Sequence, residues 1–310
     1  MPVACDSKRD RPPAPRTRAC CILTALDLSF ETMHRIVEEG DVGAYQLGKG
    51  TTGLMYTCNG GFIDFGHLFD YVDQTAYYYH YVAKADANDP KKKLIPGYPD
   101  GKVIMKSNSA AADWPTVAAS IAFDYSIFHE IESYWILFPG YRNSAFSPED
   151  LVSNYTGARI AERALGVVRT SGKKFDDAVT AELKTVLGLL QPRTKAQTEA
   201  AFRAISGTWV IDAFSELALG DNGYLKRRNV NYAPIRPCFV SDPGTGCMGV
   251  PAYPSAIGTS FPTAIRDSYD AEYVVDPDAR YRLGTTVKKS DFVRLISDIT
   301  PHADVGVLCP

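Results

Sequence analysis

The stretch from Asp113 to about Phe138 is the sequence feature that most limits how this chain can fold. It opens with Asp113-Trp114-Pro115, a helix N-cap followed by proline in the first turn, and it runs until a Pro-Gly-Tyr sequence. Apolar side chains recur on nearly every face of this predicted helix: Val117, Ile121, Phe123, Tyr125, Phe128, Ile131, Trp135 and Leu137. A helix with this pattern is buried on most of its faces, which predicts a core of several helices.

Apolar periodicity and capping signals predict further helices along the chain. One helix is predicted from Gly61 to about Ala85, and another begins at Ser147, which caps it, with Pro148 in its first position. Further helices are predicted over 174–190, over 194–206 after a Thr194 to Gln197 capping box, over 209–218 and over 289–298. Short apolar runs and glycines favour brief strands at 20–60, and loops with a few short strands dominate from about residue 222. We therefore predict a mainly α (α+β) fold with short N-terminal strands and a loop-rich C-terminal wrap.

The N-terminal residues 1–18 are rich in proline and arginine, so we expect a disordered tether there and a single, mostly helical domain over 19–310. Val3-Ala4-Cys5 followed by this polar tether looks like the mature start of a bacterial lipoprotein, which predicts a lipid anchor at Cys5 in the native precursor. A plain cytosolic tail fits the same residues.

Charge and composition exclude several classes of partner. The chain has 33 basic and 36 acidic residues, so no global field favours nucleic acid. No stretch reaches the roughly 18 to 20 apolar residues that span a bilayer, so we expect no transmembrane segment. The sequence GKGTTG lacks the spacing of a phosphate-binding loop, and we expect no nucleotide cofactor.

The chain has seven cysteines and no CxxC motif, which argues against a structural zinc ribbon. Cys238 and Cys247 flank the turn-rich sequence FVSDPGTG, where a short disulfide loop is a reasonable prediction; other cysteines, such as Cys20, Cys21 or Cys309, are then left for other pairs. We expect an oxidising compartment, the periplasm or the cell envelope, over the cytoplasm.

Two histidines with acidic neighbours form the candidate site. His67 has Asp64 and Asp70 three residues away on either side, so one carboxylate can orient the imidazole on a helix while another faces a metal or substrate. His129 and Glu130 lie in the apolar helix, where ionisable groups need partners.

We therefore predict a metal-dependent hydrolase in which His67 and His129 bind a divalent ion together with Asp64 or Asp70. Glu130 acts as the general base towards metal-bound water. Zinc suits this set best, and iron or manganese suits an added oxygen ligand. Ser133 stands where the zinc protease motif HExxH has its second histidine, and the missing ligand argues against an ordinary zinc protease.

Cys58 is the alternative catalytic residue. It precedes Asn-Gly-Gly and a predicted helix start, where a thiolate is stabilised, so a cysteine acyl hydrolase or transferase with a histidine base is the second hypothesis. A buried thiol or half of a disulfide explains the same residue.

Tyr71, Tyr78 and Asn154 are the predicted substrate-binding residues. Tyr71 and Tyr78 belong to a tyrosine-rich surface of the first helix that can line a cleft for a small-molecule or envelope-derived substrate. Such surfaces are more often the edge of a core, where the tyrosine hydroxyls find partners. The third hypothesis is a non-catalytic envelope binding protein, in which the histidines and acids form a buried network that specifies helix packing.

Three segments together resemble an uncharacterised bacterial family, domain of unknown function 4056: GLMYTCNGGFIDFGHLFDYVDQTAYY, FHEIESYW and SAFSPEDLVSNYTGARIAERAL. The resemblance covers residues 18 to about 240. Many members look like secreted lipoproteins, so the resemblance implies an envelope location, and it implies no particular activity.

Overall fold

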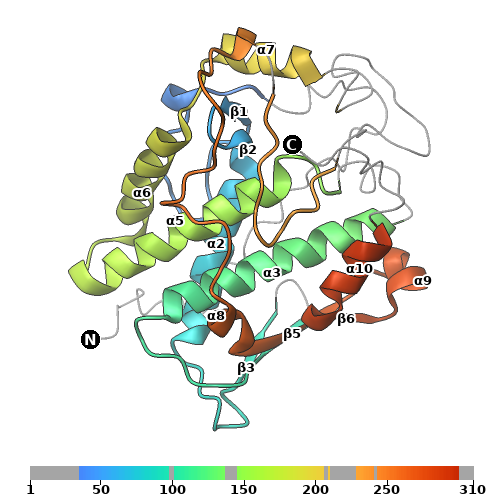
Figure 1. Cartoon of the computed structure of the whole chain (residues 1–310). Coiled ribbons are helices and arrows are strands. Elements are labelled where there is room, and N and C mark those ends of the chain that lie inside the picture. The colour runs from blue at the N-terminus through green and yellow to red at the C-terminus, as the bar shows by residue number, and fades with distance from the viewer. Residues whose placement is uncertain are drawn as a thin grey trace.

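The computed structural model describes residues 35–97, 101–136, 145–205, 209, 228–240 and 243–299. Three long helices pack against one another at its centre: α2 (Phe65–Val82), α3 (Trp114–Trp135) and α5 (Asp150–Ser171). Helix α6 (Phe175–Leu190) packs on α5, and α7 (Lys195–Ile205) lies at the far end against the first strand (Figure 1). The predicted multi-helix core is confirmed.

Helix α3 is the most buried element of this core. Its side chains are buried almost continuously from Pro115 to Tyr134, as its all-round apolar pattern predicts. Asp113 precedes the helix but makes no side-chain capping hydrogen bond. The helix ends at Trp135, a little before the predicted end, because Ile136 already has an extended backbone.

The structure has two antiparallel sheets. In the first, β1 (Leu54–Thr57) pairs with β2 (Gly61–Asp64). The second has the order β3-β4-β5-β6, with bounds Leu94–Pro96, Gly101–Met105, Tyr269–Val274 and Thr286–Lys288. The helix predicted from Gly61 therefore begins four residues later, because those residues pair with β1 and bury Phe62 and Ile63.

Helix starts elsewhere test the capping predictions. Thr194 and Gln197 form the predicted reciprocal box, with the Gln197 N–H donating to Thr194 Oγ1 at 3.3 Å. Helix α5 begins at Asp150 rather than just after Ser147, because the Ser147 N–H donates to Asp150 Oδ2 at 3.0 Å and the intervening residues form a turn. The predictions for 1–18 and 210–218 lie outside the described residues.

The C-terminal part is a loop-rich wrap, as predicted. Its helices are short: α8 (Thr263–Asp267), α9 (Arg280–Leu283) and α10 (Phe292–Ile299), with 3-10 turns at Pro243–Thr245, Pro277–Ala279 and Lys289–Asp291; a further turn, Glu39–Asp41, lies near the other end. Strand β5 extends the sheet begun by β3 and β4, while α8 and α10 pack on α3 (Figure 1). Within the described ranges, no helix is both long and apolar enough to cross a membrane.

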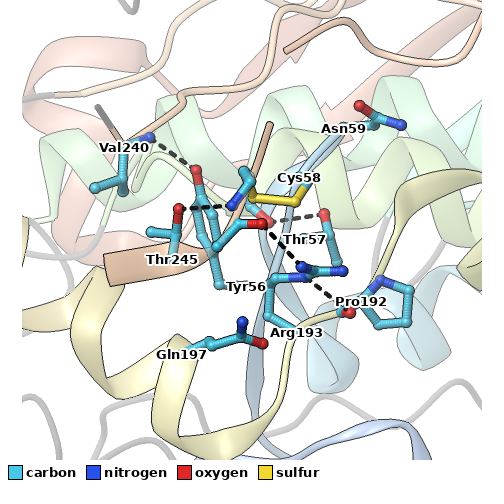
Figure 2. The surroundings of a disulfide bond; sticks show 12 residues. Tyr56, Thr57, Cys58, Asn59, Pro192, Arg193, Gln197, Val240 and Thr245 are labelled. Atoms are coloured by element: carbon cyan, nitrogen blue, oxygen red, sulfur yellow. Dashed lines mark hydrogen bonds between the residues drawn. A yellow bond between two sulfur atoms is a disulfide. The ribbon is translucent and has the colours of Figure 1, made fainter. Parts of the chain in front are cut away.

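Cys247 is bonded to Cys58 and not to Cys238, so the predicted short disulfide loop is wrong. The β1–β2 hairpin lies directly against the C-terminal loop, where the Val240 N–H donates to Tyr56 Oη at 2.9 Å and brings the loop to Cys58 (Figure 2). Cys238 is also disulfide-bonded. Because Cys58 has no free thiol in this structure, it does not serve as a thiolate nucleophile here.

Candidate functional site: an acidic histidine cluster

The first turn of α2 is held in place by Asp64. Its Oδ1 atom accepts hydrogen bonds from the backbone N–H of Gly66 at 2.5 Å and of His67 at 3.3 Å, which caps the helix. The Asp64 N–H in turn donates to Ser153 Oγ on α5 at 2.9 Å. These contacts fix the start of α2 against α5 and bring His67 to the first turns of that helix.

His67 lies between two side chains of α5. Its Nδ1 atom is 3.1 Å from Asn154 Oδ1, and its Nε2 atom is 3.7 Å from Asp150 Oδ1. With the amide oxygen facing the ring, Nδ1 carries the proton and donates, which leaves Nε2 facing the carboxylate. The His67 side chain is 16% exposed, so solvent reaches this otherwise buried position.

The two histidines of the cluster have opposite electrostatic environments. Burial lowers the pKa of His67, but the carboxylates of the cluster outweigh this effect and leave that pKa raised; they are Asp64, Glu130, Asp70 and Glu149. Burial and the nearby charge of His67 lower the pKa of His129, and Glu130 opposes them only in part. The cluster therefore favours positive charge at His67 and a neutral imidazole at His129.

Glu130 supports the segment that leads into α5. Its side chain is 2% exposed, and Oε2 accepts from the Phe146 N–H at 2.6 Å. Phe146 has a positive φ of 58°, a conformation that such a residue adopts only when its surroundings hold it there. The Asn229 N–H and the Arg228 guanidinium donate to the carbonyls of Phe146 and Ala145. Glu130 thus fixes the chain that delivers Asp150 to His67.

Two polar atoms of the cluster are buried without a hydrogen-bond partner: Ser147 Oγ and Asn154 Nδ2. Ser147 is 4% exposed and Asn154 is fully buried. Buried polar groups in proteins are almost always paired, so these two atoms point to a bound water molecule or ligand.

The structure brings most of the predicted site residues together. Tyr71 belongs with them, since its pKa is raised by burial first and then by neighbours that include Glu130 and Asp70. Tyr78 is fully buried in the core. Asn154 contacts the histidine ring itself. Cys58 is bonded to Cys247 at the β1–β2 hairpin.

The sequence did not identify Asp150 and Ser147 as site residues, because Ser147 is accounted for as the predicted helix cap and an acid in a first helical turn needs no further explanation. Their spacing carried a signal: Ser147, Asp150 and Asn154 follow one another at intervals of three and four, which places them on one face of a helix. Across the described part of the chain, no three His, Cys, Asp or Glu side chains converge to hold a metal ion by themselves. The ligand set predicted around His67 and His129 stays a prediction.

Comparison with known proteins gives a family and no activity. The family model described as "Protein of unknown function (DUF4056)" matches residues 36–218, more than half of the chain, which confirms the resemblance seen in the sequence. No curated protein and no solved structure matches. The matched range contains α2, α3 and α5 with the whole cluster, whereas Cys247 and strands β5 and β6 lie beyond it.

Proposed function

Because this chain belongs to the DUF4056 family, whose function is unknown, we propose a function from its own residues: a hydrolase of the bacterial cell envelope with the acidic histidine cluster as its reaction centre. One observation carries the proposal. His67 is oriented through Nδ1 by Asn154 while its Nε2 faces Asp150 and the ring stays partly exposed. An imidazole whose orientation is fixed by an acceptor on one nitrogen and which stays partly exposed is an arrangement that catalytic histidines use.

Water is the attacking group that we assign, since the sulfur of Cys58 is in a disulfide. We assign the general base to His129 rather than to Glu130. Glu130 is almost fully buried and already bonded to the Phe146 N–H. His129 is partly exposed, and its lowered pKa keeps it neutral and able to accept a proton.

The envelope location is supported by the Cys58–Cys247 disulfide, which joins positions 189 residues apart in the sequence. Structural disulfides persist in oxidising compartments and are rare in the cytosol. A small-molecule or envelope-derived substrate is consistent with that location, and a lipid anchor at Cys5 is part of the same proposal.

The test is hydrolysis by the purified protein of ester, amide and peptidoglycan-fragment substrates. We expect His67→Ala and His129→Ala each to lower kcat/KM by at least about 100-fold. The matched control is Asp73→Asn, a buried carboxylate on the same helix as His67 that is hydrogen-bonded to Tyr45. Thermal unfolding of every variant verifies that it is folded.

Two results would argue against the hydrolase. One is turnover that survives both histidine substitutions. The other is the absence of turnover on all three substrate classes together with a loss of stability in the variants, which would make the cluster a buried network that specifies helix packing.

A further inference from the structure

The segment 243–265 has no charged residue, although charged residues make up 22% of the chain. A stretch of 23 residues with the average composition would hold about five of them. The segment is not a piece of the core, because it runs over the surface from the α7 end of the molecule across α5 to α8, and most of its side chains are exposed or half-buried (Figure 1). Depletion of charge on an accessible surface is typical of surfaces that lose contact with water when they bind.

Met248 and Val250 form an apolar tip, residues 248–250, in this segment. Their side chains are 95% and 93% exposed, the two highest values among the large apolar side chains that the structure describes. Gly249 between them has a φ of 86°, and a Cβ atom added there would meet no atom within 4 Å. The apolar tip therefore stands clear of the rest of the protein, so both of its side chains are available to an apolar partner.

The anchors on either side keep the apolar tip in this exposed position. Cys247, immediately before the tip, is bonded to Cys58 on the β1–β2 hairpin. Shortly after the tip, Tyr253 Oη lies 2.7 Å from Thr156 Oγ1 on α5. A loop with both ends attached cannot fold its apolar side chains back into the core, so their exposure is a fixed property of this structure.

Two guanidinium groups hold the chain on either side of the apolar tip. Arg193 Nη1 donates to the Gly246 carbonyl at 3.3 Å, and Arg163 Nη2 donates to the Ala256 carbonyl. Within the part of the chain that the structure describes, neither arginine forms an ion pair with a carboxylate, and Glu162, which precedes Arg163, is already ion-paired within α5. The apolar tip is therefore flanked by positive charge.

This combination fits a lipid surface better than a folded partner. A stable interface between proteins buries about 800 Å² on each side, and two protruding side chains supply only a small part of that area. A bilayer needs no complementary groove: apolar side chains enter the boundary of the acyl chains, and nearby basic groups are attracted to anionic head groups.

We propose that the apolar tip inserts into the surface of an anionic bilayer, and that Arg163 and Arg193 strengthen this contact by attraction to the lipid head groups. Met248 and Val250 lose their contact with water on insertion, which is the source of the binding free energy. The proposal depends neither on the hydrolase function nor on a lipid anchor.

The experiment is co-sedimentation of the purified full chain, produced without a lipid modification, with vesicles. One set of vesicles contains phosphatidylcholine with phosphatidylglycerol, and the other contains phosphatidylcholine alone. We expect binding to the anionic vesicles that weakens at high salt. Replacing Met248 and Val250 together by serine should weaken it at least about tenfold, and Arg163→Gln should weaken it less.

Val293→Ser is the matched control, since Val293 is another exposed apolar residue, 71% exposed on α10, and lies outside the segment. It should bind as the unmodified protein does. Thermal unfolding verifies that every variant is folded. As a second measurement, the fluorescence of Met248→Trp should shift to the blue when anionic vesicles are added, whereas that of Val293→Trp should not.

Three results would overturn the lipid contact. The first is absence of binding to anionic vesicles, and the second is equal binding by the double serine variant. The third is a dimer seen by analytical ultracentrifugation that is lost in the double serine variant, which would make the apolar tip an interface between two copies of this chain. Vesicle binding that depends on the tip supports the lipid contact whether or not the protein hydrolyses any substrate.

Discussion

Helix α3 takes part in two buried charged groups that are built in opposite ways. Asp124 is 1% exposed and shares its carboxylate among three partners: Arg266 Nη2 at 3.1 Å, Lys289 Nζ at 3.1 Å and Tyr269 Oη at 2.6 Å. Ser120 bonds the Tyr269 hydroxyl in turn at 2.8 Å. Here cations outnumber the carboxylate, and every one of these polar groups has a partner.

The acidic histidine cluster is paired less completely. Among its described residues, Ser147 Oγ and Asn154 Nδ2 are buried without a hydrogen-bond partner. A fully paired network stabilises the packing of the C-terminal wrap on α3, whereas an incompletely paired one leaves buried atoms that a water molecule or a ligand can pair. Buried charge alone therefore does not distinguish a structural network from a functional site. The two are distinguished by whether each buried polar atom has a hydrogen-bond partner.

The largest expected effect is at the paired network. Asp124→Ala leaves the charges of Arg266 and Lys289 without their buried partner, and we expect it to lower the free energy of unfolding by about 4 kcal/mol, measured by urea denaturation. Asp124→Asn, which keeps one acceptor oxygen and the side-chain volume but loses the charge, should cost less. A loss below about 1 kcal/mol for Asp124→Ala would mean that the network is not structural.

The disulfide comes next, because it anchors the hairpin from which α2 and His67 follow. Replacing both Cys58 and Cys247 by serine removes a link across 189 residues and should lower the free energy of unfolding by about 3 kcal/mol in urea. The Asp124 network lies elsewhere, so Asp124→Ala should cost the same in this background as in the unmodified protein. Unequal costs would show that the two regions are coupled.

Glu132 is a third carboxylate on α3, and the effect expected there lies between those at the disulfide and at Asp150. Its described hydrogen-bond partner is the Asp276 N–H at 2.6 Å. Burial raises the pKa of Glu132 to about 7. The folded state then holds the proton more tightly than the unfolded state does, so stability should fall as pH rises from about 4.5 to about 7. After allowance for partial exposure we expect a fall of about 2 kcal/mol.

Glu132→Gln should abolish this part of the pH dependence, because the amide oxygen still accepts from Asp276 and carries no proton. Urea unfolding of both proteins at several pH values measures the difference. Parallel stability profiles for the two proteins would contradict the assignment.

The smallest expected effect is Asp150→Asn. The substitution removes the carboxylate that faces His67 and keeps an acceptor for the Ser147 N–H. We expect the free energy of unfolding to fall by no more than about 1 kcal/mol, because His67 keeps the other carboxylates of the cluster. Asp124→Asn should cost more. Equal losses at the two positions would show that the two networks stabilise the fold to the same extent.

Much of the fold could be predicted from local patterns. The apolar residues on most faces of α3 predicted a buried helix, and the Thr194 to Gln197 box predicted the start of α7. Both features are predictable because they depend on residues within a few turns of the chain. In the cluster, the spacing of Asp64, His67 and Asp70 and the His129-Glu130 pair identified groups that need partners, which the structure brings together across the helices.

The sequence by itself determined that α3 is a buried helix and that two histidines stand among acids. Only the tertiary structure decided what these groups meet: Cys58 pairs with Cys247, Asp150 and Asn154 flank His67, and Glu130 supports Phe146. Each of these contacts joins residues far apart in the chain. The local periodicity of the sequence predicts which face of a helix or strand is buried. Which side chains then meet depends on how the packed elements are aligned with one another, and no single segment of the sequence encodes that alignment.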